Sequence, residues 1–385
     1  MTILARFEEQ GCGCDAIDPL GGTVTIDEAL ARIIGNARAV PETHEMALVG
    51  AVGRMLASDV RAAAPAPAFD NAAMDGYAIN SADLEGFGPW RLPVVARIAA
   101  GQVFAGTIPS GTAAQIFTGA RIPDGADAVV MQEHVQLSGE TIVLSRKVKP
   151  RTHIRMTGED MAAGDIAIPA GRLLGTRDIA AGAAAGAMNV PVRRRVRVAL
   201  LVTGDEVRAT GHARNSSDIW DVNSPMLMAA MAGMGVDLVH VQTGKDKRDA
   251  LQQQLGALAD QVDLIVTTGG ISVGGEDHVK PALDGLGASM VFSGVAMKPG
   301  KPVSYGRLGQ AHWLGLPGNP LSAYITWQVF GTVLCRILAG GAPIGNQRRN
   351  VVLGNRLRHR GNRCELRLCS IAGFDGMGRE VIRFD

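Results

Sequence analysis

The chain has 385 residues, of which 46% are hydrophobic and 19% are charged, and its formal net charge is +1. This length exceeds one ordinary hydrophobic core, so about two to four domains are expected, and the composition argues against disorder. The small charge gives no overall attraction to nucleic acid, so an anion site has to be local. We expect no membrane segment, because the uncharged run at 179–192 is too rich in Ala and Gly. The lack of a secretory signal predicts a cytoplasmic protein.

The N-terminal residues 1–22 are an expected flexible leader that contains Cys12 and Cys14. These two thiols could ligate a metal or react with an oxidant, but free thiols are favoured, because a zinc site needs four ligands. The odd total of five cysteines argues against a disulfide framework. Cys364 and Cys369 lie in an apolar–polar alternation, which predicts that both are small core residues.

The next segment, residues 23–60, is predicted to be helical. Thr25 is suited to cap the helix, acidic residues follow it, and Pro41 breaks the helix. From residue 62 to residue 150 the pattern changes to short alternating runs separated by Gly and Pro, which is typical of a small β-rich domain. The predicted strands lie at 93–96, 115–118, 128–131 and 141–144.

A second helical segment is expected over residues 170–192, with its start near Thr176. Together, residues 23–61 and 151–195 therefore predict a helical linker domain. Arginines gather at the end of this domain, and they indicate either a basic patch or, preferably, a solvated hinge. They are Arg193, Arg194, Arg195 and Arg197.

Residues 196–340 alternate between apolar runs and helical patterns, which predicts an α/β domain with a doubly wound sheet. The run at 198–202 is uninterrupted, as expected for a parallel strand buried on both faces. Residues 345–385 contain short strand-like runs and predict a partial C-terminal β domain. The other expected elements of the α/β domain are strands at 236–242 and 264–268, and helices after 223 and over 246–259.

Three apolar runs in the second half, at 264–268, 291–297 and 312–316, each end in a loop rich in glycine and proline. Open parallel sheets bind ligands beyond the carboxyl ends of their strands, and glycines there let backbone N–H groups approach an anion. Lys298 and Lys301 add charges that are suited to phosphate. The pattern predicts a site for a phosphorylated small molecule. The loops are 269–277, 298–302 and 317–320.

Acidic residues also follow strands of the predicted α/β domain. Asp205 and Glu206 come after the strand at 198–202, Asp246 after the strand at 236–242, and Asp277 in the glycine loop after the strand at 264–268. A single acid at such a position is usually a helix cap. Several carboxylates beside an anion site would repel the ligand unless a cation lies between them, and oxygen ligands suit Mg²⁺.

Three segments of the first half leave two interpretations open. Residues 69–78 place acids, an amide and a tyrosine after prolines, which indicates either a functional loop or a turn held by Asp and Asn side chains. Residues 155–160 are either functional or a surface helix cap. Residues 117–120 place one hydroxyl at a strand end, which alone is weak support for a site.

Together these segments resemble the molybdopterin molybdenumtransferases, a family that includes the E domain of gephyrin. The resemblance implies insertion of molybdate into adenylylated molybdopterin, with release of AMP and formation of molybdenum cofactor. It also implies Mg²⁺ dependence and a homodimer with an active site shared between subunits. An adenylyltransferase that supplies the substrate and molybdoenzymes that receive the product are implied partners. The matching segments are 69–78, 118–120, 158–160, 203–206, 221–223, 268–277, 298–302 and 315–320.

The same resemblance implies a role for each matching position. Asp75, Thr118 and Asp160 would act in catalysis from the other subunit. The remaining catalytic positions, which would also hold the metal, are Glu206, Asp246 and Asp277. The positions that would bind the pterin and the nucleotide are Thr203, Gly204, Asp205, Gly269, Gly270, Ser272, Gly274, Lys298, Lys301, Pro317, Gly318, Asn319, Pro320 and Arg363.

The C-terminal segment departs from the family. Family members continue past this point, and a later serine-bearing loop is missing here, although 361–363 resembles an arginine-bearing turn. The departure leaves a second hypothesis, a molybdopterin-binding scaffold or carrier without turnover, which the intact acids disfavour. A third, a generic nucleotide-dependent phosphotransferase, is disfavoured because the sequence has no Walker-type Gly-x-x-x-x-Gly-Lys-Ser/Thr motif.

Overall fold

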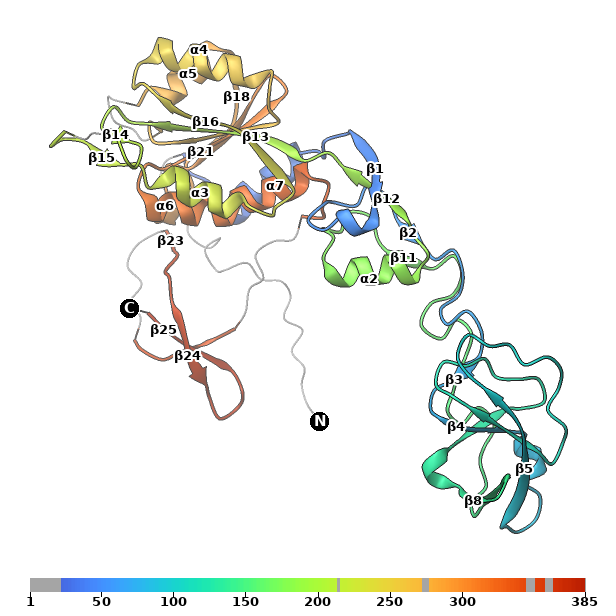
Figure 1. Cartoon of the computed structure of the whole chain (residues 1–385). Coiled ribbons are helices and arrows are strands. Elements are labelled where there is room, and N and C mark those ends of the chain that lie inside the picture. The colour runs from blue at the N-terminus through green and yellow to red at the C-terminus, as the bar shows by residue number, and fades with distance from the viewer. Residues whose placement is uncertain (1–21, 213–214, 272–276, 344–349, 357–362, 385) are drawn as a thin grey trace.

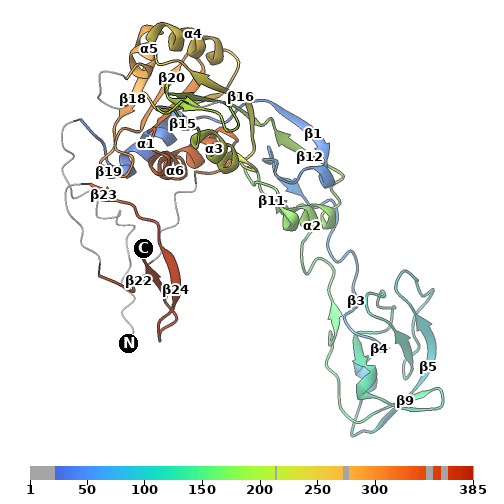
Figure 2. The same cartoon turned by 60° about the vertical axis from the view of Figure 1, so that its left-hand side comes forward.

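The computed structural model describes residues 22–212, 215–271, 277–343, 350–356 and 363–384. The chain is elongated: an α/β body lies at one end, a β-rich part at the other, and a linking region between them (Figure 1). Turning the molecule shows the same separation (Figure 2). The predicted leader with Cys12 and Cys14 lies outside the described residues.

The α/β body is built on a sheet in the order β16–β13–β17–β21–β20–β18. The first four strands are parallel, and β20 runs antiparallel to both of its neighbours. This arrangement confirms the predicted α/β fold and places the carboxyl ends of β13, β17 and β21 at one edge. The strands are β13 (Val196–Thr203), β16 (Val236–Gly244), β17 (Leu264–Thr268), β18 (Ser289–Ser293), β20 (Ser304–Leu308) and β21 (Ala311–Leu316).

Helices cover both faces of this sheet, because alternate residues of each strand point to opposite faces. Val198 and Leu200 pack on one side with α1, α3, α6 and α7, whereas Ala199 and Leu201 pack on the other with α4 and α5. The helices are α1 (Ile26–Asn36), α3 (Asn223–Met231), α4 (Arg248–Ala259), α5 (Val279–Gly285), α6 (Pro320–Thr326) and α7 (Thr332–Leu338). A π-helical turn, η5 (Trp327–Gly331), joins α6 to α7.

The helical stretch Pro320–Leu338 is long and apolar enough to cross a membrane by length and composition. However, 67% of it is buried inside the α/β body. Trp327 and Phe330 are fully buried in the core that α1 and the sheet share. The stretch therefore has the surroundings of a core helix.

The linking region is less helical than predicted. Only residues 26–36 of the predicted helix at 23–60 form α1, and this helix packs into the α/β core instead of the linking region. The residues that follow form β1 (Thr43–Ala47), which pairs antiparallel with β12 (Asn189–Arg193). The local sequence pattern around residues 43–47 cannot predict a strand partner that lies so far away in the chain. The rest of the region contains β2 (Val60–Arg61), β11 (Ile166–Ile168) and α2 (Thr176–Ala184), which is shorter than the helix predicted over 170–192.

The arginine cluster is neither a loose hinge nor an open basic patch. Arg194 donates to both carboxylate oxygens of Asp263 at 2.8 and 3.1 Å, and the backbone N–H of Arg197 donates to Asp263 at 2.7 Å. Burial alone would raise the pKa of Asp263, but these hydrogen bonds outweigh it and lower the pKa. Arg195 pairs with Asp237, and Arg193 donates to the carbonyl of Val40. The arginines thus fix the linking region to the α/β body.

The β-rich part contains a six-stranded sheet in the order β7–β4–β6–β5–β9–β8. The four strands predicted over 62–150 are all present as β5, β6, β7 and β9. The antiparallel pair β3 (Asn71–Ala72) and β10 (Ile154–Arg155) lies where the chain enters and leaves this part. The strands are β4 (Gly76–Ile79), β5 (Trp90–Ile98), β6 (Ala113–Ile116), β7 (Ala128–Met131), β8 (Gln136–Ser138) and β9 (Thr141–Leu144).

The C-terminal segment forms a three-stranded sheet of β22 (Val352–Leu353), β25 (Glu380–Arg383) and β24 (Ser370–Phe374). A further strand, β23 (Cys364–Glu365), pairs with β19 (Met297–Lys298) of the α/β body. Cys364 is half-buried, but Cys369 is exposed, so the prediction that it is a core residue is wrong. Even the large apolar side chains of Ile371 and Phe374 in this sheet are exposed. The described part of the sheet therefore has no core in which Cys369 could be buried.

Candidate active site

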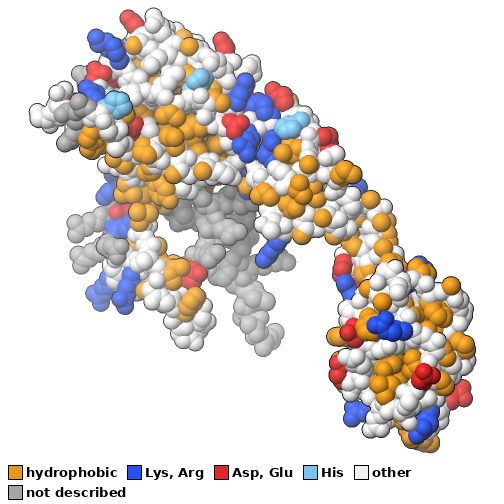
Figure 3. All heavy atoms as spheres, in the orientation of Figure 1, with side chains coloured by type: hydrophobic (Ala, Val, Ile, Leu, Met, Phe, Trp, Pro, Cys, Tyr) orange, Lys and Arg blue, Asp and Glu red, His pale blue; other side chains and the backbone are white. Residues whose placement is uncertain are grey.

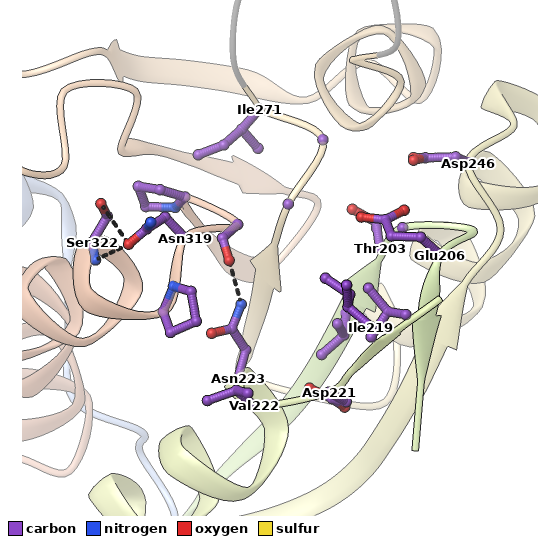
Figure 4. Close-up of a pocket in the computed structure, with 18 of the residues that line it drawn as sticks. Thr203, Glu206, Ile219, Asp221, Val222, Asn223, Asp246, Ile271, Asn319 and Ser322 are labelled. Carbon is purple, nitrogen blue, oxygen red and sulfur yellow. Dashed lines mark hydrogen bonds between the residues drawn. The ribbon is translucent and has the colours of Figure 1, made fainter. Parts of the chain in front are cut away.

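A cavity of about 880 Å³ lies at the carboxyl ends of β13, β17 and β21 (Figure 4). Its walls come from the loops that follow these strands and from the short strands β14 (Val207–Arg208) and β15 (Ile219–Trp220). Most of the predicted pterin-binding and acidic residues of this domain meet here. The predicted residues that line it are Thr203, Gly204, Glu206, Asp246, Gly269, Gly270, Asp277, Pro317, Gly318, Asn319 and Pro320.

Glycine is required where β13 and β17 end side by side. Gly269 has φ +92°, and a Cβ atom there would lie 2.7 Å from both the carbonyl oxygen and the hydroxyl of Thr203. A Cβ atom at Gly270 would lie 3.1 Å from the same hydroxyl. Both positions therefore bring bare backbone to the cavity wall, as the glycine pattern predicts.

A buried amide ties three walls of the cavity together. The Asn223 side chain at the start of α3 donates at 2.8 Å to the Thr268 hydroxyl and at 2.8 Å to the Gly318 carbonyl. Thr268 in turn donates to the carbonyl of Pro317 at 3.1 Å. Asn223 is only 7% exposed, and its Oδ1 is buried without a hydrogen-bond partner. Figure 4 shows the amide directed at the loop after β21.

Two of the acidic residues occupy the opposite wall. Glu206 and Asp246 lie together in Figure 4, across the cavity from Asn319 and Ser322. Asp205 does not line the cavity; its carboxylate instead accepts the backbone N–H of Asp246 at 3.2 Å and so positions that residue's loop.

The acids can be tested against the implied Mg²⁺. Among the described residues, no group of three His, Cys, Asp or Glu side chains is close enough to hold a metal ion by itself. Glu206, Asp246 and Asp277 nevertheless line one cavity. Mg²⁺ keeps several waters and is usually bound by one or two carboxylates together with substrate phosphates. This spacing fits an ion that is completed by the substrate and does not fit a closed protein cage.

The structure does not bring the predicted cationic residues into the cavity. Pro302 lines it, but Lys298, Lys301 and Arg363 are not among the lining residues. Lys298 lies with its Nζ 4.0 Å from Glu365, which β23 places beside it. Ser272 and Gly274 lie outside the described residues.

A second polar cluster lies where the β-rich part meets its connections. The backbone N–H and hydroxyl of Thr118 donate to Asp75 at 2.8 and 2.7 Å, and these bonds lower the pKa of Asp75. The backbone N–H and hydroxyl of Thr157 donate to Asp70 in the same way, both at 2.7 Å, and lower its pKa. Both aspartates are therefore held as half-buried carboxylates. Asp160 pairs with Arg155 of β10.

Sequence reasoning did not assign site roles to Asp70, Thr157 and Asn223, although all three fall in segments that it singled out. The signal that could have found Asn223 is its place immediately after Asp221 and Val222, in the matching segment 221–223. For Asp70 and Thr157, the repeated pairing of an aspartate with a distant threonine becomes visible only when the chain is folded.

The two clusters lie in different parts of the molecule, on either side of the linking region. The cavity belongs to the α/β body, whereas Asp75, Thr118 and Asp160 lie in or beside the β-rich part, beyond the linking region (Figure 1). The space-filling view shows that part standing clear of the α/β body (Figure 3). A single chain therefore does not bring these three residues to the cavity.

Comparisons with known proteins agree with this division. Residues 24–186 match the MoeA N-terminal region (domain I and II), and residues 199–336 match a probable molybdopterin binding domain. The molybdopterin molybdenumtransferases of Haemophilus influenzae and of a Nostoc species are both 35% identical to the chain over 305 residues. These matches cover 79% of this chain and 75% of the Haemophilus protein, and 78% of this chain and 70% of the Nostoc protein.

A solved structure of the molybdopterin biosynthesis moeA protein from Pyrococcus horikoshii is similar over most of its length. It superimposes with a TM-score of 0.77 at 26% identity, covering 94% of this chain and 89% of that chain. The chain belongs to the molybdopterin molybdenumtransferase family.

Proposed function

We propose that this protein is a transferase that inserts molybdate into adenylylated molybdopterin, releasing AMP and forming molybdenum cofactor. The observation that carries the proposal is the cavity at the sheet edge. It combines a bare glycine wall, a buried amide and four acids within a domain matched to molybdopterin binding. Its volume of about 880 Å³ is in the range of cavities that hold small molecules.

The residues that line the cavity would have different roles in binding the substrates and the metal ion. The backbone N–H group at Gly270 would approach the phosphate, while the hydrogen bonds of Asn223 hold the loops that surround the pterin. Glu206, Asp246 and Asp277 are the residues that would hold Mg²⁺, which when bound offsets the repulsion between two anionic substrates. A molybdate oxygen would attack the phosphoanhydride phosphorus on the pterin side, and AMP would leave with the electron pair of the broken P–O bond. The two pterin thiolates would then bind molybdenum and displace the pterin phosphate, which leaves with the electron pair of the broken Mo–O bond.

A second copy of the chain belongs to the same proposal. Asp75, Thr118 and Asp160 are ordered by their own hydrogen bonds but lie far from the cavity of their own chain. A homodimer in which each β-rich part reaches the partner's cavity would complete two sites. We place this enzyme in the cytoplasm, between an adenylyltransferase that supplies its substrate and molybdoenzymes that take its product.

The test is to incubate the purified full chain with adenylylated molybdopterin, Mg²⁺ and molybdate, and to measure AMP and cofactor. We expect AMP release that depends on molybdate and is lost when a chelator removes the metal. Tight binding of adenylylated molybdopterin with no molybdate-dependent AMP release would overturn the enzyme and favour a scaffold or carrier. AMP release that persists in chelator would overturn the magnesium part alone.

A further inference from the structure

A second cavity, of about 590 Å³, lies in the β-rich part, far from the α/β cavity. Its walls come from β7, from the end of β9 and from the loop that follows β9. One portion of the lining is apolar and the other is basic. The apolar residues are Val129, Val130, Met131, Leu144 and Val148, and the basic ones are His134, Arg146, Lys147, Lys149 and His153.

The lining contains no counter-charge. Among the described residues that line the cavity, none is Asp or Glu. Within the described part of the chain, Arg146, Lys147 and Lys149 form no side-chain ion pair or hydrogen bond. The neighbouring Asp127 accepts from the backbone N–H and hydroxyl of Ser81, so its carboxylate is already engaged. Several like charges gathered around one concave surface raise the local concentration of anions.

The basic loop is held in place by its backbone. Arg151 and His153 have φ +64° and +53°, a region that side chains other than glycine rarely adopt. Hydrogen bonds fix this path: Arg151 N–H donates to the Asp127 carbonyl at 2.7 Å, and Val129 N–H donates to the Thr152 carbonyl at 2.9 Å. The His153 Nδ1 lies 3.0 Å from the Val129 carbonyl oxygen. Strained backbone that its surroundings hold is often found at ligand sites, and a fixed loop loses little entropy on binding.

We propose that this cavity binds a small organic phosphate. Arg and Lys are the side chains that best recognise phosphate oxygens, and the apolar wall offers a surface for the organic body of the same molecule. The volume suits a single small molecule and not an extended acidic polypeptide. The cavity shares no lining residue with the α/β cavity, so the inference does not depend on the proposed molybdate insertion.

The experiment follows amide hydrogen exchange of the full chain by mass spectrometry, with AMP and with inorganic pyrophosphate as probes. We expect AMP to slow exchange in the peptides covering 128–134 and 145–153 in a saturable manner. The double variant Arg146→Gln/Lys149→Gln should raise the AMP concentration needed for this protection by about a hundredfold, because each of the two lost charged contacts is worth roughly a factor of ten. Arg91→Gln/Arg177→Gln is the matched control, since both arginines are exposed and neither lines the cavity.

Local readout separates this site from the α/β cavity, where AMP would protect peptides around Thr203 and Gly269. Protection confined to those peptides would overturn the inference. So would protection at 145–153 that both double variants reduce equally. An acidic peptide that protects the cavity when AMP and pyrophosphate do not would assign it to a protein partner and also overturn the proposal. Unchanged AMP release by the Arg146→Gln/Lys149→Gln variant, together with its weakened protection at 145–153, would support a binding site that is separate from the α/β cavity.

Discussion

At the residue scale, the α/β cavity depends on a few side chains that do different kinds of work. The Asn223 side chain joins the end of β17 to the loop after β21 through its two N–H groups. Asp277 lines the cavity at the end of the glycine loop, just before α5. The first residue is therefore expected to matter for stability and function, whereas the second is expected to matter for function alone.

Replacing the buried amide should damage both properties. Asn223→Ala removes the donors that satisfy the Thr268 hydroxyl and the Gly318 carbonyl, so we expect a loss of about 1–3 kcal/mol in the free energy of unfolding. Urea unfolding measures this loss, and AMP release should fall with it. A variant with wild-type stability would show that water replaces the amide.

Replacing the acid should affect turnover only. Asp277→Asn should reduce AMP release by about a hundredfold or more, because an electrostatic contribution at the reacting groups is lost. The melting temperature should change little. Asp284→Asn, an exposed residue near the end of the helix α5 that follows Asp277, is the matched control and should keep wild-type activity. Equal losses of stability and activity in Asp277→Asn would identify a structural cap instead.

At the element scale, neighbouring strands β20 and β21 share a buried polar pair. Tyr305 and His312 lie with the hydroxyl 2.8 Å from Nδ1, and their rings stack at 5.9 Å. Burial raises the pKa of Tyr305 to about 12, and burial followed by the charge of Arg307 lowers the pKa of His312 to about 4. The phenol therefore donates to a neutral imidazole, and this pair joins the two strands that lead to the cavity edge.

The pair predicts a pH dependence of stability. The folded protein binds a proton on His312 less readily than the unfolded chain, whose histidines titrate near 6.5, so stability falls as the pH drops from 6.5 to about 4. The shift corresponds to about 3 kcal/mol, complete at the lower end of that range. His312→Gln should show a flatter profile over the same range in urea titrations. Parallel profiles for the two proteins would remove His312 as the source.

The elements differ in how far local sequence determines them. Alternation predicted β5, β6, β7 and β9, and uninterrupted apolar runs predicted β13 and β17, because burial on one or two faces leaves a local pattern. Residues 43–47 form a strand and not the predicted helix. Their strand partner, β12, lies beyond the whole β-rich part in sequence, so the local pattern could not reveal the pairing. Arg194 and Asp263 are likewise far apart in the chain, so their pairing could not be predicted.

The candidate site shows the same limit. Glycines and acids at strand ends predicted which loops meet at the α/β cavity, because parallel strands share one edge. The engagement of Lys298 by Glu365 depends on the pairing of β19 with β23, which adds one short strand at a distance. The hydrogen bonds between Asp75 and Thr118 join residues 43 positions apart, so they could not be predicted without the fold of the β-rich part.

At the scale of the whole molecule, the linking region separates two parts of one proposed site. The Asp75 cluster and the α/β cavity are each ordered by contacts within their own part. Arg194, which lies between β12 and β13, is hydrogen-bonded to Asp263 of the α/β body. These bonds attach the linking region to that body. If the site is shared between two copies, two inactive variants can complement each other, whereas a site within one chain would not allow this.

Two inactive variants should restore activity when their subunits are mixed. Asp75→Asn and Asp246→Asn alter different halves, so a mixed dimer contains one intact site and one doubly altered site. Random pairing of equal amounts should give about a quarter of wild-type activity, since half of the dimers are mixed. AMP release after co-refolding measures the effect. Asp75→Asn mixed with Thr118→Val is the control and should stay inactive, because both changes fall in the same half.

The distance between the two clusters also has a kinetic consequence. If neither chain holds a complete site, the catalyst is the pair, and its amount is set by an association equilibrium. The reaction would then be second order in total protein at dilutions where most chains are single, and first order where most are paired. Specific activity, usually treated as a constant of an enzyme, would become a measure of the dissociation constant between its halves.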